Sequence, residues 1–318
     1  MLHLKGRLPE LSTFEQVRLS ESFTIGMSAY GNAATTLNAL GALFQSATGD
    51  FELILVDDCS PDQGEIRQIF AEVRAQHNRT RIFTFEENLE YSGSLNAILS
   101  HAQGEQILFL SNDIFVTPSY LRELLSVANT TPKAGIIRGV SNFVDNGLST
   151  HNIPGCEAIN NYLTLFQFAE KIERDNKGKF LLDSYLTGDA FMVHRAVLDK
   201  IGTFDPLFFG YFADHDFGIR TKIAGFELLL AQGAFAFHQR HANFDYLPPE
   251  QRESKARTRW ARVYENWARF KLKYGLPIPK PYGHINTIPW DTLSGAPFEP
   301  GQHYSAPQDY GKFESNND

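Results

Sequence analysis

Short apolar runs recur along the first part of the chain, each followed by polar residues and then by a helical pattern. The runs are Phe23–Met27, Phe51–Val56, Arg81–Phe85 and Ile107–Leu110. The last run has no room for a polar face, which indicates a strand buried on both sides. Strands that alternate with helices of about ten to fifteen residues are joined by right-handed crossovers. The sequence therefore predicts an α/β fold with a doubly wound, mostly parallel central sheet.

An aspartate, Asp113, stands just beyond the fourth run, after Ser111 and Asn112. Open α/β sheets bind their ligands at the carboxyl ends of their strands, so Asp113 is a candidate contact for a ligand or a metal. The alternative is that Asp113 caps the helix that Pro118 begins.

Two adjacent carboxylates, Asp57 and Asp58, follow the second run. Two adjacent carboxylates repel each other and cost stability unless a cation or a hydrogen-bond donor compensates their charge. A nucleobase or a ribose can supply such a hydrogen bond. The alternative is a solvated turn over residues 58–62. The chain contains neither GxGxxG after its first strand nor GxxxxGK[ST]. Dinucleotide-dependent hydride transfer and P-loop hydrolysis therefore lose their main support.

In the second half the alternation loosens, and acidic residues gather at the start of one further helix. Asp214 and Asp216 follow the aromatic run Phe208–Phe212. Capping by the helix dipole explains one of them, whereas an aromatic wall that raises the pKa of an acid favours a general base. His238 ends the strand-like stretch Phe226–Phe237, where it is either a structural residue or a contact for a metal or diphosphate.

Composition argues against several classes of protein. A net charge of −8 and a pI near 5.7 argue against nucleic acid as the main partner. The two cysteines, Cys59 and Cys156, form no CxxC pair, which favours a reducing setting. Residues 1–22 lack the apolar core of a signal peptide, and no run approaches the ~18 apolar residues of a membrane-spanning helix. We therefore expect a cytoplasmic protein.

The last part of the chain, 245–318, predicts an amphipathic helix and a tail. From Gln251 to Lys273 basic residues outnumber acids, and aromatic residues recur at helical spacing. The aromatic face either packs on the rest of the protein, or the helix contacts an anionic membrane surface, at the inner face of the plasma membrane, or a lipid-diphosphate acceptor. After Pro277 the composition predicts an extended or partly disordered tail.

Five segments in this order resemble family 2 glycosyltransferases, which have the GT-A fold. They are the acidic loop Asp57–Asp62, the stretch Asn88–Ala97, Leu110–Asp113 at the position of the DxD metal motif, the run Gly188–Asp216, and His238. The resemblance implies a GT-A domain over 23–244, between an N-terminal extension, 1–22, and the C-terminal part. Residues 23–113 would bind the nucleotide-sugar, and residues 114–244 would bind the acceptor and supply the base.

The resemblance implies inverting transfer of a sugar from a nucleotide-sugar, with UDP or dTDP, to a hydroxyl of a glycan or lipid-linked acceptor, in the synthesis of a surface polysaccharide. Asp214 would be the catalytic base, and Asp113 with His238 would hold Mn²⁺ or Mg²⁺ beside the diphosphate. Gly188, Asp189 and Asp216 would lie at the donor or acceptor sugar. The nucleotide would contact Ser28, Tyr30, Asp57, Asp58, Asn88, Gly93, Asn96 and Asn112.

Two residues depart from the family's pattern. Ser111 stands at the first acid of DxD, so the diphosphate would hold more of the metal, and Ala213 stands where a Glu usually precedes the base. These departures keep open a binding module that has lost turnover. A sugar-nucleotidyltransferase is a further alternative, but residues 28–32 contain no Lys or Arg to grip phosphates.

Overall fold

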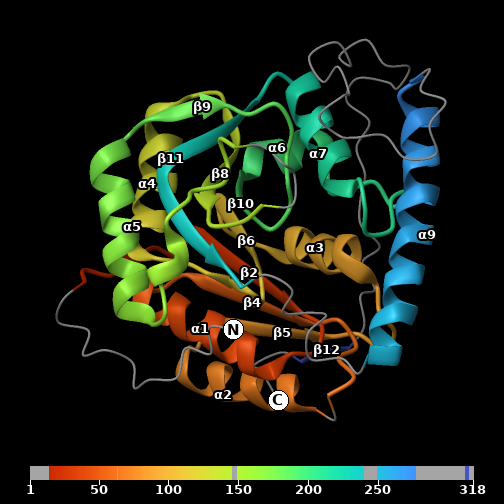
Figure 1. The fold of residues 1–318 in the computed structure, drawn as a ribbon, viewed down its shortest axis with the longest axis horizontal. Coiled ribbons are helices and arrows are strands. Elements are labelled where there is room, and N and C mark those ends of the chain that lie inside the picture. The colour runs from red at the N-terminus through yellow and green to blue at the C-terminus, as the bar shows by residue number, and fades with distance from the viewer. Residues whose placement is uncertain (1–13, 63, 145–148, 240–248, 277–311, 315–318) are drawn as a thin grey trace.

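A twisted central sheet with helices packed around it forms the body of the protein (Figure 1). The computed structural model describes residues 14–62, 64–144, 149–239, 249–276 and 312–314. Its helices are α1 (Ala33–Ser46), α2 (Glu65–Gln76), α3 (Glu90–His101), α4 (Pro118–Thr130), α5 (Tyr162–Asn176), α6 (Arg195–Ile201), α7 (Ala213–Ile223) and α9 (Pro249–Lys273).

The strands fall into one large sheet and one small pair. They are β1 (Val17–Leu19), β2 (Phe23–Ala29), β3 (Ala47–Gly49), β4 (Glu52–Asp57), β5 (Thr80–Thr84), β6 (Gln106–Ser111), β7 (Ile114–Phe115), β8 (Ala134–Ser141), β9 (Phe180–Leu182), β10 (Ala190–His194), β11 (Glu227–His238) and β12 (Lys312–Glu314). The large sheet has the order β12-β5-β4-β2-β6-β10-β8-β11-β7, with β9 beside β11, and β1 pairs with β3.

The large sheet is parallel in its first half and mixed in its second. Strands β5, β4, β2 and β6 run parallel to one another. Strand β10 runs antiparallel to both β6 and β8, and β11 runs parallel to β8. Because β10 alone is reversed among these central strands, β2, β4, β6, β8 and β11 all end at the same edge of the sheet. The expected α/β class is confirmed, and the reversal of β10 refines the expected parallel order.

Successive residues of the central strands feed two cores on opposite faces of the sheet. Leu108 and Leu110 of β6 enter a cluster with α1, α2, α4 and α5. Ile107 and Phe109 enter the other cluster, with α3, α6, α7 and α9. All four side chains are fully buried, which is why this strand reads as a continuous apolar run.

Part of the N-terminal extension and part of the tail add strands to the fold. Strand β1 pairs with β3, and Leu19 is buried in the first core. The domain boundaries expected at residues 22 and 244 stay predictions. Helix α5 was not expected from the sequence. In the tail, β12 pairs with β5, whereas residues 277–311 and 315–318, like most of the N-terminal extension, lie outside the described residues.

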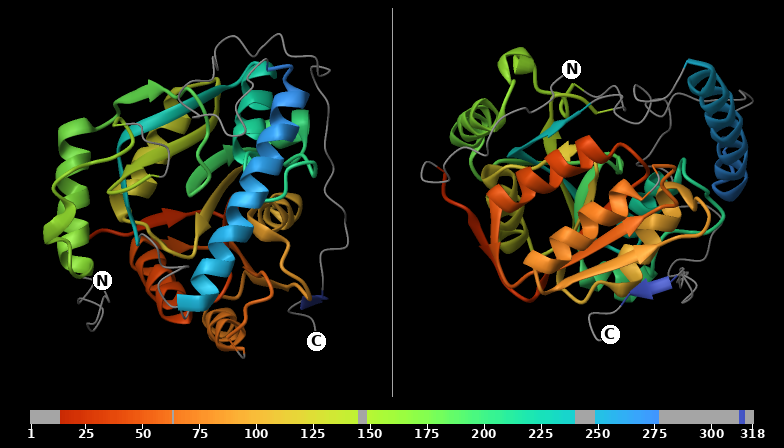
Figure 2. Two further views of the ribbon diagram at one scale, coloured as in Figure 1. Left: turned by 45° about the vertical axis from the view of Figure 1, so that its right-hand side comes forward. Right: turned by 90° about the horizontal axis from the view of Figure 1, so that it is seen from below.

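Helix α9 runs along one side of the molecule (Figure 2). Val263, Trp267 and Phe270 are buried in the second core, so this part of its aromatic face packs on the body. Trp260 and Tyr264 remain 50% and 46% exposed. Within the described ranges, none of the helices has the length and apolar character needed to cross a bilayer.

Candidate functional site

The acidic segments singled out in the sequence meet at the edge where β2, β4, β6, β8 and β11 end. The reversed strand β10 starts there, and the Ser111 amide donates to the Asp189 carbonyl at 3.1 Å. The Gln239 amide, just past β11, donates to the Asp113 carbonyl at 2.8 Å. Residues far apart in the chain are therefore placed together by the strand order, as open α/β sheets place their ligand sites.

Asp113 and His238 face each other at this edge. His238 Nε2 lies 3.4 Å from Asp113 Oδ2, and His238 Nδ1 lies 3.1 Å from the Phe143 carbonyl oxygen. Donation from Nδ1 to the carbonyl leaves Nε2 of the neutral ring as the coordinating nitrogen, the usual arrangement behind a metal-binding histidine. The capping interpretation of Asp113 fails, because Thr117 caps α4 by accepting from the Tyr120 amide.

The Asp113–His238 pair fits a divalent cation only in part. Burial alone would lower the pKa of His238, but the charge and hydrogen bond of Asp113 outweigh it and raise that pKa to about 9. No group of three His, Cys, Asp or Glu side chains suited to a metal occurs in the described part of the chain. A carboxylate with an imidazole suits Mn²⁺, provided that a ligand such as a diphosphate supplies the remaining oxygens.

Asp57 and Asp58 lie in different environments despite being adjacent. Asp57 accepts a hydrogen bond from the Ser60 amide at 2.9 Å and pairs with Arg67 Nε at 2.9 Å, so groups of the protein compensate its charge. Asp58 accepts from the Leu89 amide at 2.7 Å and has no cationic partner among the described residues. Burial, joined by repulsion from Asp57, raises the pKa of Asp58 to about 7, against the effect of the Leu89 hydrogen bond. Asp58 is therefore the better candidate for a ligand contact.

Asp214 lies in the first turn of α7 and accepts three hydrogen bonds. The Gly188 amide donates to Oδ2 at 3.0 Å, and His215 lies against Oδ1 through its amide at 2.9 Å and its Nδ1 at 2.7 Å. A carboxylate has about four acceptor positions, so Oδ2 keeps capacity for a proton donor from a substrate.

Tyr91 connects α3 to the Gly188 segment that contacts this carboxylate, and it was not predicted as a site residue. Its hydroxyl donates to the Gly188 carbonyl at 2.7 Å. A Cβ on Gly188 would lie 1.6 Å from that hydroxyl oxygen, so a glycine is required there for close approach of the two segments. Burial, together with the charges of Asp214 and Asp189, raises the pKa of Tyr91, which therefore stays a proton donor to the carbonyl.

Asp189 is held by a buried arginine. Arg138 Nη2 lies 2.9 Å from Asp189 Oδ1, and the Arg138 side chain is only 2% exposed. Arg138 interrupts the apolar run of β8, and a charged residue at such a position is a sequence signal for a buried ion pair. Asn142, also missed, fixes the backbone of His238 through hydrogen bonds of 3.0 and 2.7 Å.

Several of the expected nucleotide contacts build the scaffold of the site. Asn96 exchanges hydrogen bonds of 3.1 and 2.8 Å with the backbone of Phe204 and so joins α3 to the loop before α7. Its expected contact with the nucleotide stays a prediction. Asn88 donates to the Asp58 carbonyl at 3.3 Å and positions that loop.

The remaining expected contacts lie around the first loop and α3. Asn112 donates to the Gly31 carbonyl at 3.3 Å and to Thr36 Oγ1 at 2.8 Å, which ties β6 to the first loop. Ser28 lies opposite Ser111 in the sheet register. Burial and the charges of Cys59 and Asp58 raise the pKa of Tyr30. The next residue, Gly31, donates through its amide to Ser60 Oγ at 2.9 Å, which places the first loop beside the acidic loop. Gly93 lies within α3, where a Cβ would meet the Leu89 side chain at 2.4 Å.

Asp216 does not belong to the site. It is 0% exposed and lies 2.7 Å from Arg220 Nε, 2.5 Å from Lys273 Nζ and 2.7 Å from the Tyr274 hydroxyl. Both carboxylate oxygens are occupied by these partners. The expectation that Asp216 contacts a sugar is corrected: the residue joins α7 to the end of α9.

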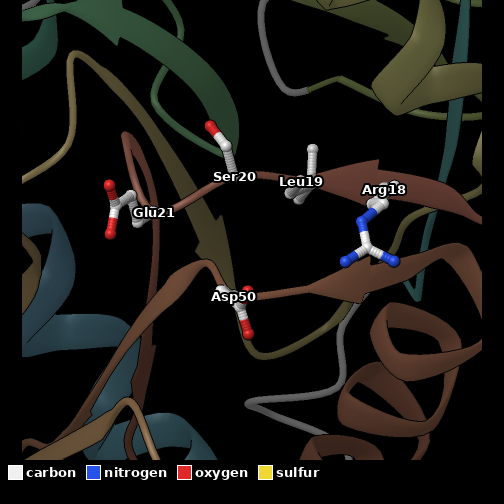
Figure 3. Close-up of a pocket in the computed structure, with 5 residues that line it drawn as sticks. All are labelled: Arg18, Leu19, Ser20, Glu21 and Asp50. Atoms are coloured by element: carbon white, nitrogen blue, oxygen red, sulfur yellow. The ribbon is translucent and has the colours of Figure 1, made fainter.

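A pocket of about 350 Å³ lies at a different place, between Arg18, Leu19, Ser20, Glu21 and Asp50 (Figure 3). These residues precede β2 and β4, so the pocket lies at the amino ends of the parallel strands. The carboxylates described above lie at the carboxyl ends, where such sheets carry their ligand sites. The pocket is therefore separate from the candidate site.

Known proteins resemble this chain at the level of family and fold. The model of Glycosyl transferase family 2 matches residues 24–202. Uncharacterized protein y4gI of Sinorhizobium fredii is 21% identical over 241 residues, which are 73% of this chain and 26% of that protein. Uncharacterized glycosyltransferase alr2836 of Nostoc sp. is 26% identical over 111 residues, 35% of this chain and 34% of that protein. The chain thus matches only about a quarter to a third of the length of these relatives.

One solved structure with the same fold is GalNAc-T7 with UDP, GalNAc and Mn²⁺. It superposes with a TM-score of 0.52 at 12% identity, over 68% of this chain and 43% of that chain. At this identity the likeness shows the GT-A fold and does not assign a role to any residue of the site.

Proposed function

The chain belongs to glycosyltransferase family 2, and on that premise we propose that it transfers a sugar from a nucleotide-sugar to an acceptor hydroxyl, with inversion at the anomeric carbon. The observation that carries the proposal is the meeting of the Asp113–His238 pair, Asp58 and the Asp214 carboxylate network at one edge of the sheet. A similarly folded protein binds UDP, GalNAc and Mn²⁺, which supports a nucleotide-sugar donor and a divalent cation.

Asp214 is the proposed general base. Its Oδ2 takes the proton of the acceptor hydroxyl as that oxygen forms a bond to the anomeric carbon, and the bond from that carbon to the diphosphate breaks on the opposite face. The nucleoside diphosphate leaves with the electron pair, and the proton passes from Asp214 to solvent. His215 and the Gly188 amide hold the carboxylate in place during this transfer.

Asp113 and His238 are the residues proposed to hold Mn²⁺ or Mg²⁺. A divalent cation bound there would supply positive charge to offset the negative charge that gathers on the leaving diphosphate. Ser111 adds no second carboxylate, so among the described residues the proposed ligands are Asp113 and His238.

Asp58 is proposed to recognise the nucleoside. A carboxylate accepts hydrogen bonds from the N–H of uracil or thymine, or from a ribose hydroxyl, which suits a UDP- or dTDP-sugar. The acceptor is proposed to be a glycan or a lipid-linked sugar in the cytoplasm, and the product part of a surface polysaccharide.

A thermal-shift screen tests the donor, the cation and the site together. UDP, dTDP, GDP and their sugar conjugates are added with and without Mn²⁺ to the wild type, to Asp113→Ala and to Asp199→Ala, an exposed aspartate on α6. A ligand that binds only the folded state raises the melting temperature. We expect one nucleotide to give a metal-dependent shift that Asp113→Ala loses and Asp199→Ala keeps.

The screen, together with assays of donor hydrolysis and of diphosphate release, separates the competing functions. Binding without slow hydrolysis of the sugar conjugate would favour a module that has lost turnover, which Ser111 and Ala213 make chemically plausible. A sugar-nucleotidyltransferase would release diphosphate from a nucleoside triphosphate and a sugar phosphate. No shift with any nucleotide, for folded protein, would overturn the donor site.

A further inference from the structure

Helix α9 is strongly cationic in an otherwise acidic protein. It carries eight lysines and arginines against three glutamates, whereas the whole chain has a net charge of −8. Six of the cations recur at spacings that place them on one face of a helix: Arg252, Lys255, Arg259, Arg262, Arg269 and Lys273. The five of these whose side chains the structure describes, Arg252, Arg259, Arg262, Arg269 and Lys273, are called the cationic stripe.

The C-terminal part of the cationic stripe is used to hold α9 on the body. Lys273 Nζ lies 2.7 Å from Asp205 and 2.5 Å from Asp216. Arg269 donates to the Leu207 carbonyl at 2.8 Å and pairs with Glu265 at 2.5 Å. These contacts show that the stripe faces the catalytic half of the protein.

The N-terminal part of the stripe reaches the margin of the candidate site. Arg262 pairs with Glu90, which follows the Asn88 loop that supports Asp58, and its guanidinium lies 5.0 Å from the centre of the Phe209 ring. The Arg259 guanidinium lies 5.7 Å from the centre of the Tyr211 ring, three residues before Asp214. The stripe thus spans the donor loop and the loop that leads to the proposed base.

Stacked guanidinium groups at this place suit an oxyanion. A guanidinium over an aromatic ring keeps its N–H groups in its own plane, where they can bind phosphate in a bidentate manner. The exposed Arg252 continues the same face toward the N-terminus of α9. A cationic surface beside an acidic body selects an anion that the rest of the protein repels.

We propose that Arg252, Arg259 and Arg262 form a subsite for a phosphate group of the acceptor. The inference rests on the proposed function and deepens it: the acceptor is a phosphate-bearing glycan or lipid, and a neutral sugar is not its natural form. The phosphate lies outside the reacting bond and orients the acceptor between the donor loop and Asp214.

Calorimetric titration of the full chain with inorganic diphosphate, in EDTA and without nucleotide, tests the subsite. The variants are Arg259→Gln/Arg262→Gln and the matched control Arg257→Gln, whose side chain is 72% exposed, lies on another face and pairs with Glu253. We expect Kd to rise roughly tenfold or more in the double variant, as for the loss of charge-assisted hydrogen bonds, and to change less than about twofold in the control. The single variant Arg259→Gln keeps the Arg262–Glu90 ion pair. Weaker diphosphate binding in this variant therefore cannot be caused by the loss of that ion pair.

Asp113→Ala separates the subsite from the donor site. If diphosphate binding survives in Asp113→Ala, the anion lies on α9 even if the nucleotide screen fails, so the two proposals are judged independently. The inference is overturned if wild type does not bind diphosphate, if Arg257→Gln weakens binding as much as the stripe variant, or if Asp113→Ala abolishes binding.

Flotation with vesicles distinguishes the two sources of the phosphate. Binding to phosphatidylglycerol vesicles but not to phosphatidylcholine vesicles, lost in Arg259→Gln/Arg262→Gln and kept in Arg257→Gln, supports a lipid headgroup. Diphosphate binding without flotation supports a phosphate on a soluble acceptor. Flotation that is equal for both vesicle types and insensitive to the stripe would contradict an anion subsite.

Discussion

At the scale of single residues, Asp214 gives the most direct test of chemistry. Asp214→Asn preserves size and one carbonyl acceptor but removes the charge that takes a proton. We expect the rate of sugar transfer to fall by about 10²–10⁴-fold, while the nucleotide-induced thermal shift is unchanged. Release of nucleoside diphosphate measures the rate, with the exposed Asp199→Asn as control. A variant that turns over as fast as the wild type would exclude Asp214 as the base.

Asp58 predicts a pH dependence of stability. Its pKa rises from 3.8 to about 7 on folding, so between these values the folded state holds more protons than the unfolded state. Stability therefore falls as the pH rises through this window. Asp58→Asn lacks this titration, and we expect its stability relative to wild type to increase by roughly 2–3 kcal/mol between pH 5 and pH 8.

Urea unfolding at both pH values measures this difference. Asp199→Asn serves as the control, because its carboxylate is exposed. A relative stability that does not change with pH would mean that the carboxylate of Asp58 is not disfavoured in the folded protein. A carboxylate kept at such a cost is expected where a ligand supplies the missing donor.

The resemblance to a known family made part of the site predictable. Asp113 and His238 were expected together because both match positions that the family uses near its metal, and the structure brings them to 3.4 Å. Asp216 was misassigned because its position in the first turn of α7 looks like a ligand site locally, and nothing in that segment reveals Lys273 and Tyr274 folding back from α9. Tyr91 was missed because its partner, a backbone carbonyl, has no sequence signature.

At the scale of elements, two tryptophans of α9 differ in burial and so test how this helix packs on the body. Trp267 is fully buried, whereas Trp260 on the same helix is 50% exposed. We expect Trp267→Ala to cost about 3–5 kcal/mol of unfolding free energy through lost burial and a cavity, and Trp260→Ala less than about 1 kcal/mol. Chemical denaturation measures both. Equal costs would contradict the packing of α9 seen here.

Elements were easier to predict than their pairing. Runs such as Ile107–Leu110 identify buried strands because both faces of the sheet are covered. The reversal of β10 depends on which neighbours it joins, and its own five residues do not encode that choice. Helix α5 was not predicted although Asn161 and Thr164 form a capping box at its start, because the polar stretch before it has the composition of loops.

At the scale of the whole molecule, α9 is joined to α7 and to the loop before α7 by buried charges. Lys273 forms ion pairs with both Asp205 and Asp216, and the Tyr274 hydroxyl donates a hydrogen bond to Asp216. We expect Lys273→Met to lower the unfolding free energy by about 3 kcal/mol or more, because it leaves carboxylates buried with less compensation. Lys271→Met on the same helix is the control, with a loss below about 1 kcal/mol. Equal losses of unfolding free energy in the two variants would contradict a buried charge network around Lys273.

The last expectation concerns whether the C-terminal part is a separate unit. All three tryptophans, Trp260, Trp267 and Trp290, lie beyond residue 244, so tryptophan fluorescence reports on that part, whereas far-UV circular dichroism reports on the entire fold. Because α9 completes the second core, we expect both signals to give one coincident transition in urea. In Lys273→Met both should move together to lower urea. A fluorescence change that precedes the loss of circular dichroism would instead mean that α9 detaches before the sheet unfolds, and that it stabilises the site without belonging to the same cooperative core.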